Sequence, residues 1–296
     1  MMMMNKYVLI NIRNIFFFVL ANINIYMRGQ KILAYYQTLT PLKPILINNP
    51  LITHIHLASI HFGLDDDNNP YIHLNNDIPY DQKFDSVWEE LEKAESLGIK
   101  VKLMIGGAGG GYAAFFSNFD VYYELLVKLL HSKRIISGID LDIEEPVDIK
   151  NVRKLINSIK SEFGDYFTIT MAPIQSSLET DEPGMGGFSY KELMQSPEGK
   201  YIDYFNVQFY SDFSLNSYQK IVSNGYSPEM IVMGAMAGEK RDDEIVKCVK
   251  KYGSTFGGVF VWEYCFAKPD PASWVVDVHT LIHTNGKKQP FFCKCC

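Results

Sequence analysis

Three carboxylates alternate with apolar residues in the segment Ser137–Pro146. The acidic residues are Asp140, Asp142 and Glu144, and the apolar residues between them are Ile139, Leu141 and Ile143. Because side chains alternate between the two faces of a β-strand, a strand here places all three carboxylates on one face. Burying like charges this close together raises the pKa of at least one of them. Such a cluster costs stability and is typical of a site that transfers protons.

Two other interpretations of these carboxylates remain open. An isolated alternating strand more often carries a solvated acidic face. Oxygen ligands in Asp-x-Asp-x-Glu spacing also suit calcium or magnesium, although an EF-hand loop needs glycine where Glu145 stands. The surrounding α/β pattern favours a site, because parallel sheets are covered on both faces and barrel enzymes react at the carboxyl ends of their strands. The acidic run at 65–70 is expected to be a loop.

The composition is that of a globular, core-forming chain. Of its 296 residues 47% are hydrophobic, and 28 Lys and Arg against 34 Asp and Glu give a net charge of −6. A mildly acidic chain without basic clusters is not expected to bind nucleic acid or an anionic membrane. Its five cysteines fit neither a disulfide framework nor a zinc pattern. Three of them, Cys293, Cys295 and Cys296, crowd the segment 287–296, which is expected to be an unstructured tail.

The first 26 residues are set apart as a signal peptide or a non-structural extension. Lys6 and Arg13 precede the apolar run Ile15–Ala21, which is shorter than the roughly 20 residues that span a bilayer. Met27 offers a downstream start of translation. Secretion is expected if residues 1–21 are a signal peptide, and an intracellular location otherwise.

From residue 31 onward, short apolar runs alternate with amphipathic stretches. The expected strands cover residues 31–37, 53–62, 100–107, 138–145, 166–172, 201–210, 230–237 and 257–264. The expected helices cover residues 85–97, 112–130, 147–163, 189–194, 215–223, 241–252 and 271–284. This α/β pattern predicts a single (β/α)8 TIM barrel over residues 27–286, since that fold takes about 250 residues. A doubly wound open sheet is the alternative, but it normally has fewer strands.

The acidic strand resembles the signature strand of glycoside hydrolase family 18, the chitinases and endo-β-N-acetylglucosaminidases. The family pattern is Asp-Gly-x-Asp-x-Asp-x-Glu on barrel strand four, and this chain has Gly-Ile-Asp-Leu-Asp-Ile-Glu at 138–144. Four further segments match family strands in the right order: 102–107, 170–173, 206–210 and 259–262. The Gln-Phe-Tyr sequence at 208–210 is similar to the compact plant- and fungal-type members. Departures are Ser137 in place of the first aspartate, Ser59 after Ala58, and Ser211 after Tyr210.

The resemblance implies a retaining mechanism in which the substrate supplies its own nucleophile, the 2-acetamido oxygen. Glu144 is then the general acid and base. Asp142 holds the acetamido N–H and stabilises the positive charge, and Asp140 shares protons or charge with Asp142. Tyr210 donates its hydroxyl to the acetamido oxygen. Ser137 removes the innermost carboxylate of the family chain, which bears on the pH profile.

The same resemblance implies the substrate-binding residues. They are Gln208, Trp262, Met171, Tyr36 and Gly107, with Trp262 as the floor under the sugar. Without the resemblance, Trp262 is more often explained as a core residue, and Tyr210 is explained equally well by packing. The implied partner is a carbohydrate that contains N-acetylglucosamine, with no metal, no organic cofactor and a monomeric chain.

Three rival functions are weighed. A chitooligosaccharide-binding lectin keeps the fold without the reaction, but Glu144 is present. A dinucleotide-dependent oxidoreductase is suggested by Gly109–Ala114, which imitates G-x-G-x-x-A, with Glu124 beyond it, although this loop lies too far from the preceding strand. An endo-β-N-acetylglucosaminidase acting on N-linked glycans shares every motif above with a chitinase. The sequence favours a chitinase that cleaves internal bonds of β-1,4-linked N-acetylglucosamine polymers.

Overall fold

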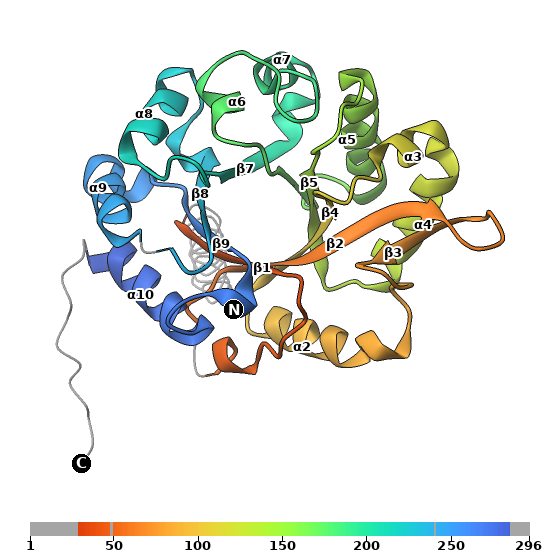
Figure 1. Ribbon diagram of the computed structural model, residues 1–296, viewed down its shortest axis with the longest axis horizontal. Coiled ribbons are helices and arrows are strands. Elements are labelled where there is room, and N and C mark those ends of the chain that lie inside the picture. Colours follow the sequence, from red (N-terminus) through yellow and green to blue (C-terminus); the bar gives the residue numbers. More distant parts are fainter. Residues whose placement is uncertain (1–28, 48–49, 240, 285–296) are drawn as a thin grey trace, which may run out of the picture.

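The computed structural model describes residues 29–47, 50–239 and 241–284. Eight parallel strands close into a barrel that helices surround, which confirms the predicted (β/α)8 TIM barrel (Figure 1). The proposed leader at 1–26 and the cysteine tail at 287–296 lie outside the described residues. No helix in the described part of the chain is long and apolar enough to cross a bilayer.

The strands run in the order β1-β9-β8-β7-β6-β5-β4-β2-β3, and the additional pairing of β1 with β2 closes the ring. Their bounds are β1 Lys31–Tyr36, β2 His54–Leu64, β3 Pro70–Leu74, β4 Lys100–Gly106, β5 Ile136–Asp142, β6 Thr168–Met171, β7 Ile202–Gln208, β8 Ile231–Met236 and β9 Gly258–Trp262. Only β3 is antiparallel, and it forms a hairpin with the end of β2. Closure brings the carboxyl ends of the parallel strands to one mouth.

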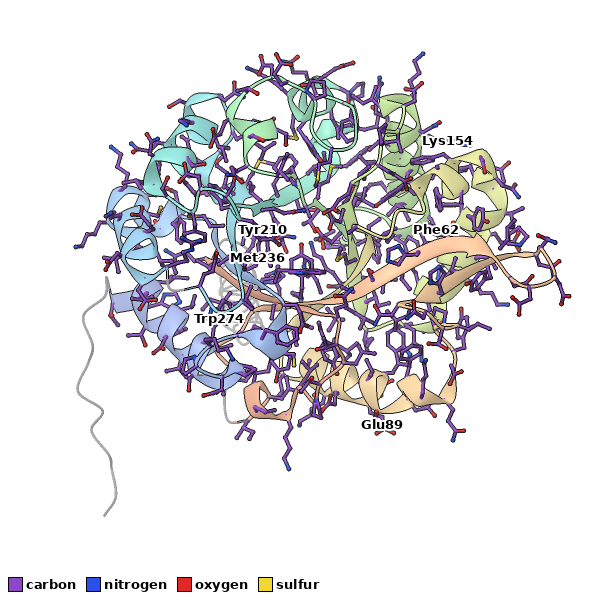
Figure 2. The ribbon with its side chains drawn as sticks, viewed as in Figure 1. Phe62, Glu89, Lys154, Tyr210, Met236 and Trp274 are labelled. Atoms are coloured by element: carbon purple, nitrogen blue, oxygen red, sulfur yellow. The ribbon has the colours of Figure 1, made fainter. Side chains whose placement is uncertain are left out.

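The helices lie outside the ring of strands. They are α2 Asp85–Ser96, α3 Tyr112–Ser117, α4 Phe119–Ser132, α5 Ile149–Phe163, α6 Ser176–Glu179, α7 Tyr190–Gln195, α8 Leu215–Ser223, α9 Asp242–Tyr252 and α10 Pro271–Thr284. Short 3-10 turns cover Lys43–Ile45, Gln82–Phe84, Gly199–Tyr201, Pro228–Met230, Gly253–Thr255 and Tyr264–Phe266. Figure 2 labels Glu89, Lys154 and Trp274 on this outer layer, whereas Tyr210 and Met236 lie near the centre of the ring.

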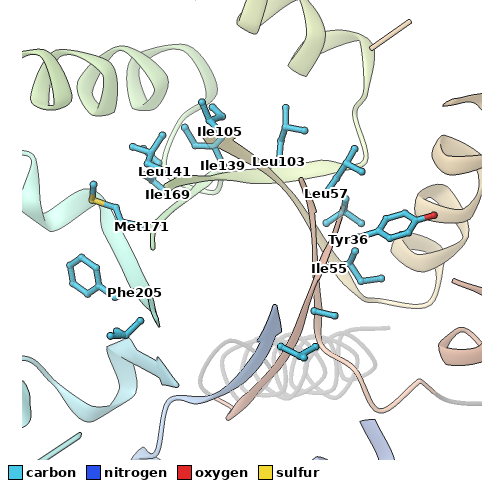
Figure 3. Packing of buried hydrophobic residues seen from close by; sticks show 14 of the residues in the cluster. Tyr36, Ile55, Leu57, Leu103, Ile105, Ile139, Leu141, Ile169, Met171 and Phe205 are labelled. Atoms are coloured by element: carbon cyan, nitrogen blue, oxygen red, sulfur yellow. The ribbon is translucent and has the colours of Figure 1, made fainter. Parts of the chain in front are cut away.

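Alternation along the strands separates two cores. The larger core fills the space between strands and helices, and Figure 3 shows Leu103, Ile139 and Leu141 pointing away from the barrel interior. The smaller core lies inside the barrel, where Leu33, Tyr35 and other buried side chains meet. Barrel interiors are usually filled by branched apolar residues. Here buried polar side chains share that space: His56, Lys102, Asp140, Thr170 and Asn206.

Three local predictions need correction. The single helix expected at 112–130 is two helices that break at Asn118. The hairpin strand β3 was not expected, although residues 65–69 do form its turn, in which the Asp65 side chain accepts from the backbone N–H groups of Asp67 and Asn69. The strand expected at 138–145 ends at Asp142, so Glu144 lies just past the strand.

Candidate active site

The three carboxylates lie at the carboxyl end of β5, where the barrel opens. Asp140 is fully buried inside the barrel, Asp142 is 6% exposed, and Glu144 is partly exposed. The intervening Ile139 and Leu141 pack in the outer core, as the alternation predicts. The group therefore grades from a dry interior to the solvent-facing mouth over five residues of chain.

Asp140 is held by hydrogen bonds from three strands. Its Oδ2 accepts from the Tyr35 hydroxyl at 2.6 Å, and its Oδ1 accepts from the Thr170 hydroxyl at 2.6 Å and from Asn206 Nδ2 at 2.9 Å. His56 Nδ1 lies 3.4 Å from Oδ2. Burial favours the protonated acid, but the attraction of the His56 ring and the hydrogen bonds from His56, Thr170 and Tyr35 outweigh it and lower the pKa of Asp140 to about 2. Asp140 is therefore a fixed negative charge at neutral pH.

The His56 ring is fully buried beside this charge. Burial lowers the pKa of His56 despite the attraction of Asp140, so the ring is neutral near pH 7. A neutral ring contributes little ion pairing. With the ring neutral the effect of His56 is smaller, and the hydrogen bonds donated by Thr170 and Tyr35 still keep the pKa of Asp140 below its ordinary value.

Asp142 has the opposite environment two residues further along the strand. Its pKa lies well above the ordinary value because of burial first, and then because of the charges of Glu144 and Asp140. Two carboxyl groups on one strand face are thus held with their pKa values far apart. That separation is typical of sites that need one group charged and the other carrying a proton.

Gln208 connects Asp142 to Glu144. Its Nε2 lies 3.2 Å from Asp142 Oδ1, 3.2 Å from Glu144 Oε1 and 2.9 Å from the carbonyl oxygen of Ala172. One amide nitrogen has two hydrogens for these three acceptors. The side chain is 7% exposed and comes from the last residue of β7. The predicted residues Asp140, Asp142, Glu144 and Gln208 are therefore brought together.

A glycine pair turns the chain tightly around Asp142. The N–H of Gly107 donates to the carbonyl oxygen of Asp142 at 2.8 Å. Both Gly106 and Gly107 have positive φ, 90° and 92°. A Cβ on Gly106 would lie 2.4 Å from the Asp142 carbonyl oxygen, and a Cβ on Gly107 would lie 3.5 Å from Asp142 Oδ2. Gly107 thus borders the site through its backbone.

We expect Gly106→Ala to lower the free energy of unfolding by about 3 kcal/mol, because the positive φ is strained for alanine and the Cβ meets a backbone oxygen. Urea denaturation measures this loss. Gly98→Ala is the control, since Gly98 has φ 85° but nothing within 4 Å of its Cβ, and it should cost about 1 kcal/mol. Equal losses for both variants would contradict the close approach at Gly106.

Two aromatic residues border the mouth, one after β7 and one at the end of β9. Trp262 ends β9 and its ring is 5.3 Å from the Tyr35 ring. Tyr210 follows β7, packs on Phe260, and has its pKa raised well above the ordinary value by burial and by the charges of Asp142 and Glu144. Both side chains are only partly buried. They leave an aromatic surface beside the carboxylates.

Tyr36 and Met171 are not brought to this site, and their prediction as wall residues is corrected. Both are fully buried in the outer core, and Figure 3 shows them pointing away from the barrel interior. The Tyr36 hydroxyl instead donates to Glu90 of α2 at 3.3 Å. Their neighbours Tyr35 and Ala172 have the opposite orientation, because alternate residues of a strand face opposite sides.

Five site residues were missed from the sequence. Tyr35, His56, Thr170 and Asn206 surround Asp140. Met236 ends β8 beside Trp262 in the strand register, with 38% of its surface exposed. The alternation that runs back from Gln208 identifies Asn206. Met236 occupies the same strand-end position as Asp142, Gln208 and Trp262, which was the available signal.

We expect Tyr35→Phe to lower the free energy of unfolding at pH 7 by about 2 kcal/mol, because the charged Asp140 loses a hydrogen bond. A depressed pKa contributes stability above the unfolded value of about 3.9, and this contribution is lost as the pH falls toward 2. The deficit should therefore be smaller at pH 3 than at pH 7 in urea denaturation. Tyr204→Phe is the control, since the Tyr204 hydroxyl has no partner among the described residues. A pH-independent deficit would contradict this account.

The glycine-rich loop at 109–114 does not present a free phosphate site. The N–H groups of Tyr112 and Ala113, which open α3, both donate to the Glu145 carboxylate. A dinucleotide would need those donors for its pyrophosphate. Within the described ranges, no three His, Cys, Asp or Glu side chains are grouped as metal ligands, so the calcium or magnesium alternative has no ligand set there.

A closed (β/α)8 barrel with carboxylates and aromatic rings at its carboxyl mouth places the chain among TIM-barrel proteins with a candidate active site at the strand ends. The sequence model of Glycosyl hydrolases family 18 matches residues 31–237. The chain belongs to glycoside hydrolase family 18, whose members act on carbohydrates that contain N-acetylglucosamine.

The chain is also similar to solved structures and to one curated relative. A fungal endo-β-N-acetylglucosaminidase of family 18 is 30% identical with a TM-score of 0.76, covering 86% of this chain and 98% of that chain. Chitinase ChiC from Aspergillus fumigatus is 29% identical with a TM-score of 0.73, covering 86% and 100%. Concanavalin B from Canavalia ensiformis is 28% identical over 140 residues, which span 42% of this chain and 39% of concanavalin B.

Proposed function

We propose that this chain is a chitinase-like hydrolase of β-1,4-linked N-acetylglucosamine polymers that works by a retaining, substrate-assisted mechanism. The observation that carries the proposal is the Gln208 amide, whose nitrogen lies 3.2 Å from Asp142 Oδ1 and 3.2 Å from Glu144 Oε1 and so keeps the two carboxyl groups together at the mouth. The pKa of Asp142 is raised, so a proton is stored beside Glu144.

In the first step Glu144 gives a proton to the glycosidic oxygen while the acetamido oxygen of the sugar bonds to the anomeric carbon. The bond to the leaving sugar breaks, and an oxazolinium ion forms. Asp142 accepts a hydrogen bond from the acetamido N–H and faces the developing positive charge. The Tyr210 hydroxyl donates a hydrogen bond to the acetamido oxygen. In the second step Glu144 takes a proton from water, whose oxygen attacks the anomeric carbon. The bond from this carbon to the acetamido oxygen breaks, which opens the oxazolinium ring.

The remaining residues position the sugar. Trp262 gives an apolar ring for the sugar face, which fits its partly exposed place at the end of β9. Asp140 stays charged because Tyr35, Thr170 and Asn206 donate to it, so it keeps the proton of the pair on Asp142. Neither of these two steps uses a metal ion or an organic cofactor.

The test is release of a fluorophore from chitobiose and chitotriose conjugates by the full chain, with and without a chelator, beside release of glycan from an N-glycosylated peptide. Cleavage of the conjugates that the chelator leaves unchanged supports the proposal. Cleavage of the N-glycan alone would replace it by an endo-β-N-acetylglucosaminidase, the activity named for the fungal structure that this chain resembles. Sugar binding without cleavage of either substrate would replace it by a lectin.

A further inference from the structure

A second hollow lies at the opposite end of the barrel from the carboxylates. A cavity of about 460 Å³ is lined by the first residues of several strands, among them Lys31, His54, Lys100 and Thr168. Asp142, Gln208 and Trp262 end their strands. Because these strands are parallel, the cavity opens at the amino ends and is separate from the mouth where a glycan would bind.

Lysine side chains converge on this cavity in a chain whose net charge is −6. Within the described residues, none of Lys31, Lys100 and Lys102 has a carboxylate oxygen within 4.0 Å of its ammonium group. Two acidic residues, Asp203 and Glu229, also line the cavity, and both are exposed. The lysine charges on the wall are therefore not neutralised by contact.

Lys102 is the buried centre of this group. It is 1% exposed, its Nζ lies 4.3 Å from the centre of the Tyr204 ring, and it donates to the Thr170 hydroxyl at 3.4 Å. Lys31 Nζ lies 4.6 Å from the centre of the same ring. The Tyr204 hydroxyl is buried and has no hydrogen-bond partner among the described residues. The ammonium groups of Lys31 and Lys102 thus both lie close to the Tyr204 ring, whose own hydroxyl is unpaired among the described residues.

We propose that this cavity binds a small anion, a tetrahedral oxyanion or a carboxylate, between Lys31, Lys102 and the Tyr204 hydroxyl. An anion supplies the counter-charge that a buried ammonium needs and the acceptor that a buried hydroxyl needs. The volume suits a small ligand, because pockets for such ligands range over about 300–1,000 Å³. The proposal is independent of the reaction at the other end of the barrel.

The protonation of Lys102 makes the proposed binding depend on pH. Burial lowers its pKa to about 7, partly opposed by the nearby carboxylates. The charged and titratable groups that face Lys102 are Lys31 of β1, His54 and His56 of β2, Asp140 of β5, Lys160 of α5, and Asp203 and Tyr204 of β7. Burial keeps His54 and His56 neutral. Burial also lowers the pKa of Lys31 to about 8, opposed by Glu229 and Asp203, so both ammonium groups lose charge as the pH rises. An anion that requires the ammonium form should bind at least about tenfold more weakly at pH 8 than at pH 6.

The test is calorimetric titration of the full chain with sulfate at pH 6 and pH 8, at constant ionic strength in chloride. Sulfate keeps its charge over this range, so the pH dependence belongs to the protein. Acetate in place of sulfate distinguishes a carboxylate ligand from a tetrahedral oxyanion. We expect saturable binding of at least one of them, weaker by at least about tenfold at pH 8.

Lys102→Met should abolish this binding and its pH dependence. It should also fold, because an apolar side chain of similar length in place of a buried charge is often neutral or stabilising. Tyr204→Phe removes only the hydroxyl and should weaken binding several-fold. Lys93→Met is the control, because Lys93 is an exposed lysine of α2. This substitution also removes one lysine charge from the protein. No saturable binding of either anion, or equal binding by Lys102→Met and Lys93→Met, overturns the proposal.

Discussion

Glu144→Gln is expected to lower kcat for a chitotriose conjugate by about 10³-fold. The amide keeps the size of the side chain and an oxygen that accepts from Gln208 Nε2, so the site should hold its shape. It has no proton to give to the leaving oxygen and takes none from water. The loss should be smaller for a conjugate whose leaving group departs without protonation, because its first step does not need a general acid. The second step still needs Glu144 as the base. Initial rates on the two conjugates measure both effects.

Glu145→Gln is the matched control one residue along the chain. Glu145 accepts hydrogen bonds from the first N–H groups of α3, and an amide oxygen also accepts them. We expect kcat within about threefold of the wild type and a loss of unfolding free energy of about 1 kcal/mol at most. If Glu144→Gln keeps more than a tenth of the activity, or if Glu145→Gln is the inactive variant, Glu144 is not the acid.

Asp142→Asn is expected to lower kcat by about 10²-fold. Asparagine resembles the protonated acid, so it still packs under Gln208, but it never carries the negative charge of ionised Asp142, which stabilises the positive charge that develops on the sugar. The pH–rate profile should also lose the limb that belongs to Asp142, because its titration is removed. Rates measured from pH 4 to pH 9 for the wild type and the variant test this.

The same substitution should stabilise the fold at neutral pH. The folded pKa of Asp142 is raised above the unfolded value of about 3.9, so its contribution to stability is present below that pH and is lost as the pH rises through the folded pKa. Asparagine does not titrate and loses nothing. We expect Asp142→Asn to gain about 1.4 kcal/mol over the wild type for each pH unit above 3.9, up to the folded pKa.

Asp140→Asn, two residues away, is expected to change the free energy of unfolding in the opposite direction. Its lowered pKa makes the charged form the stable one, so removing the charge should destabilise the protein at pH 7. Urea denaturation at pH 4 and pH 7 compares the two variants. The account fails if both change stability in the same direction between these two pH values.

The barrel and its acidic strand were predictable from the sequence, because β5 alternates apolar and acidic residues and only one phase buries the apolar set. The segment TITM of β6 alternates in the same way, and that alternation already turns Met171 toward the helices. The prediction of Met171 as a wall residue came from the family resemblance alone, and the alternation along β6 contradicts it.

Strand β1 offered no such guide. Its sequence KILAYY is apolar on both faces, so either phase fits and the choice between Tyr35 and Tyr36 was not readable. The contacts of Asp140 were beyond prediction for another reason. They join β1, β2, β6 and β7, and closure of the barrel decides which of their residues share a level.

The most direct measurement of the central claim is the anomeric configuration of the first product from chitotetraose, followed by proton NMR before the anomers equilibrate. Attack by the acetamido oxygen and then by water inverts the anomeric carbon twice. The account therefore predicts an initial excess of the β-anomer with the wild-type chain and product formation about 10³-fold slower with Glu144→Gln. An initial excess of the α-anomer would show a single displacement by water, and it would contradict the mechanism proposed for this site.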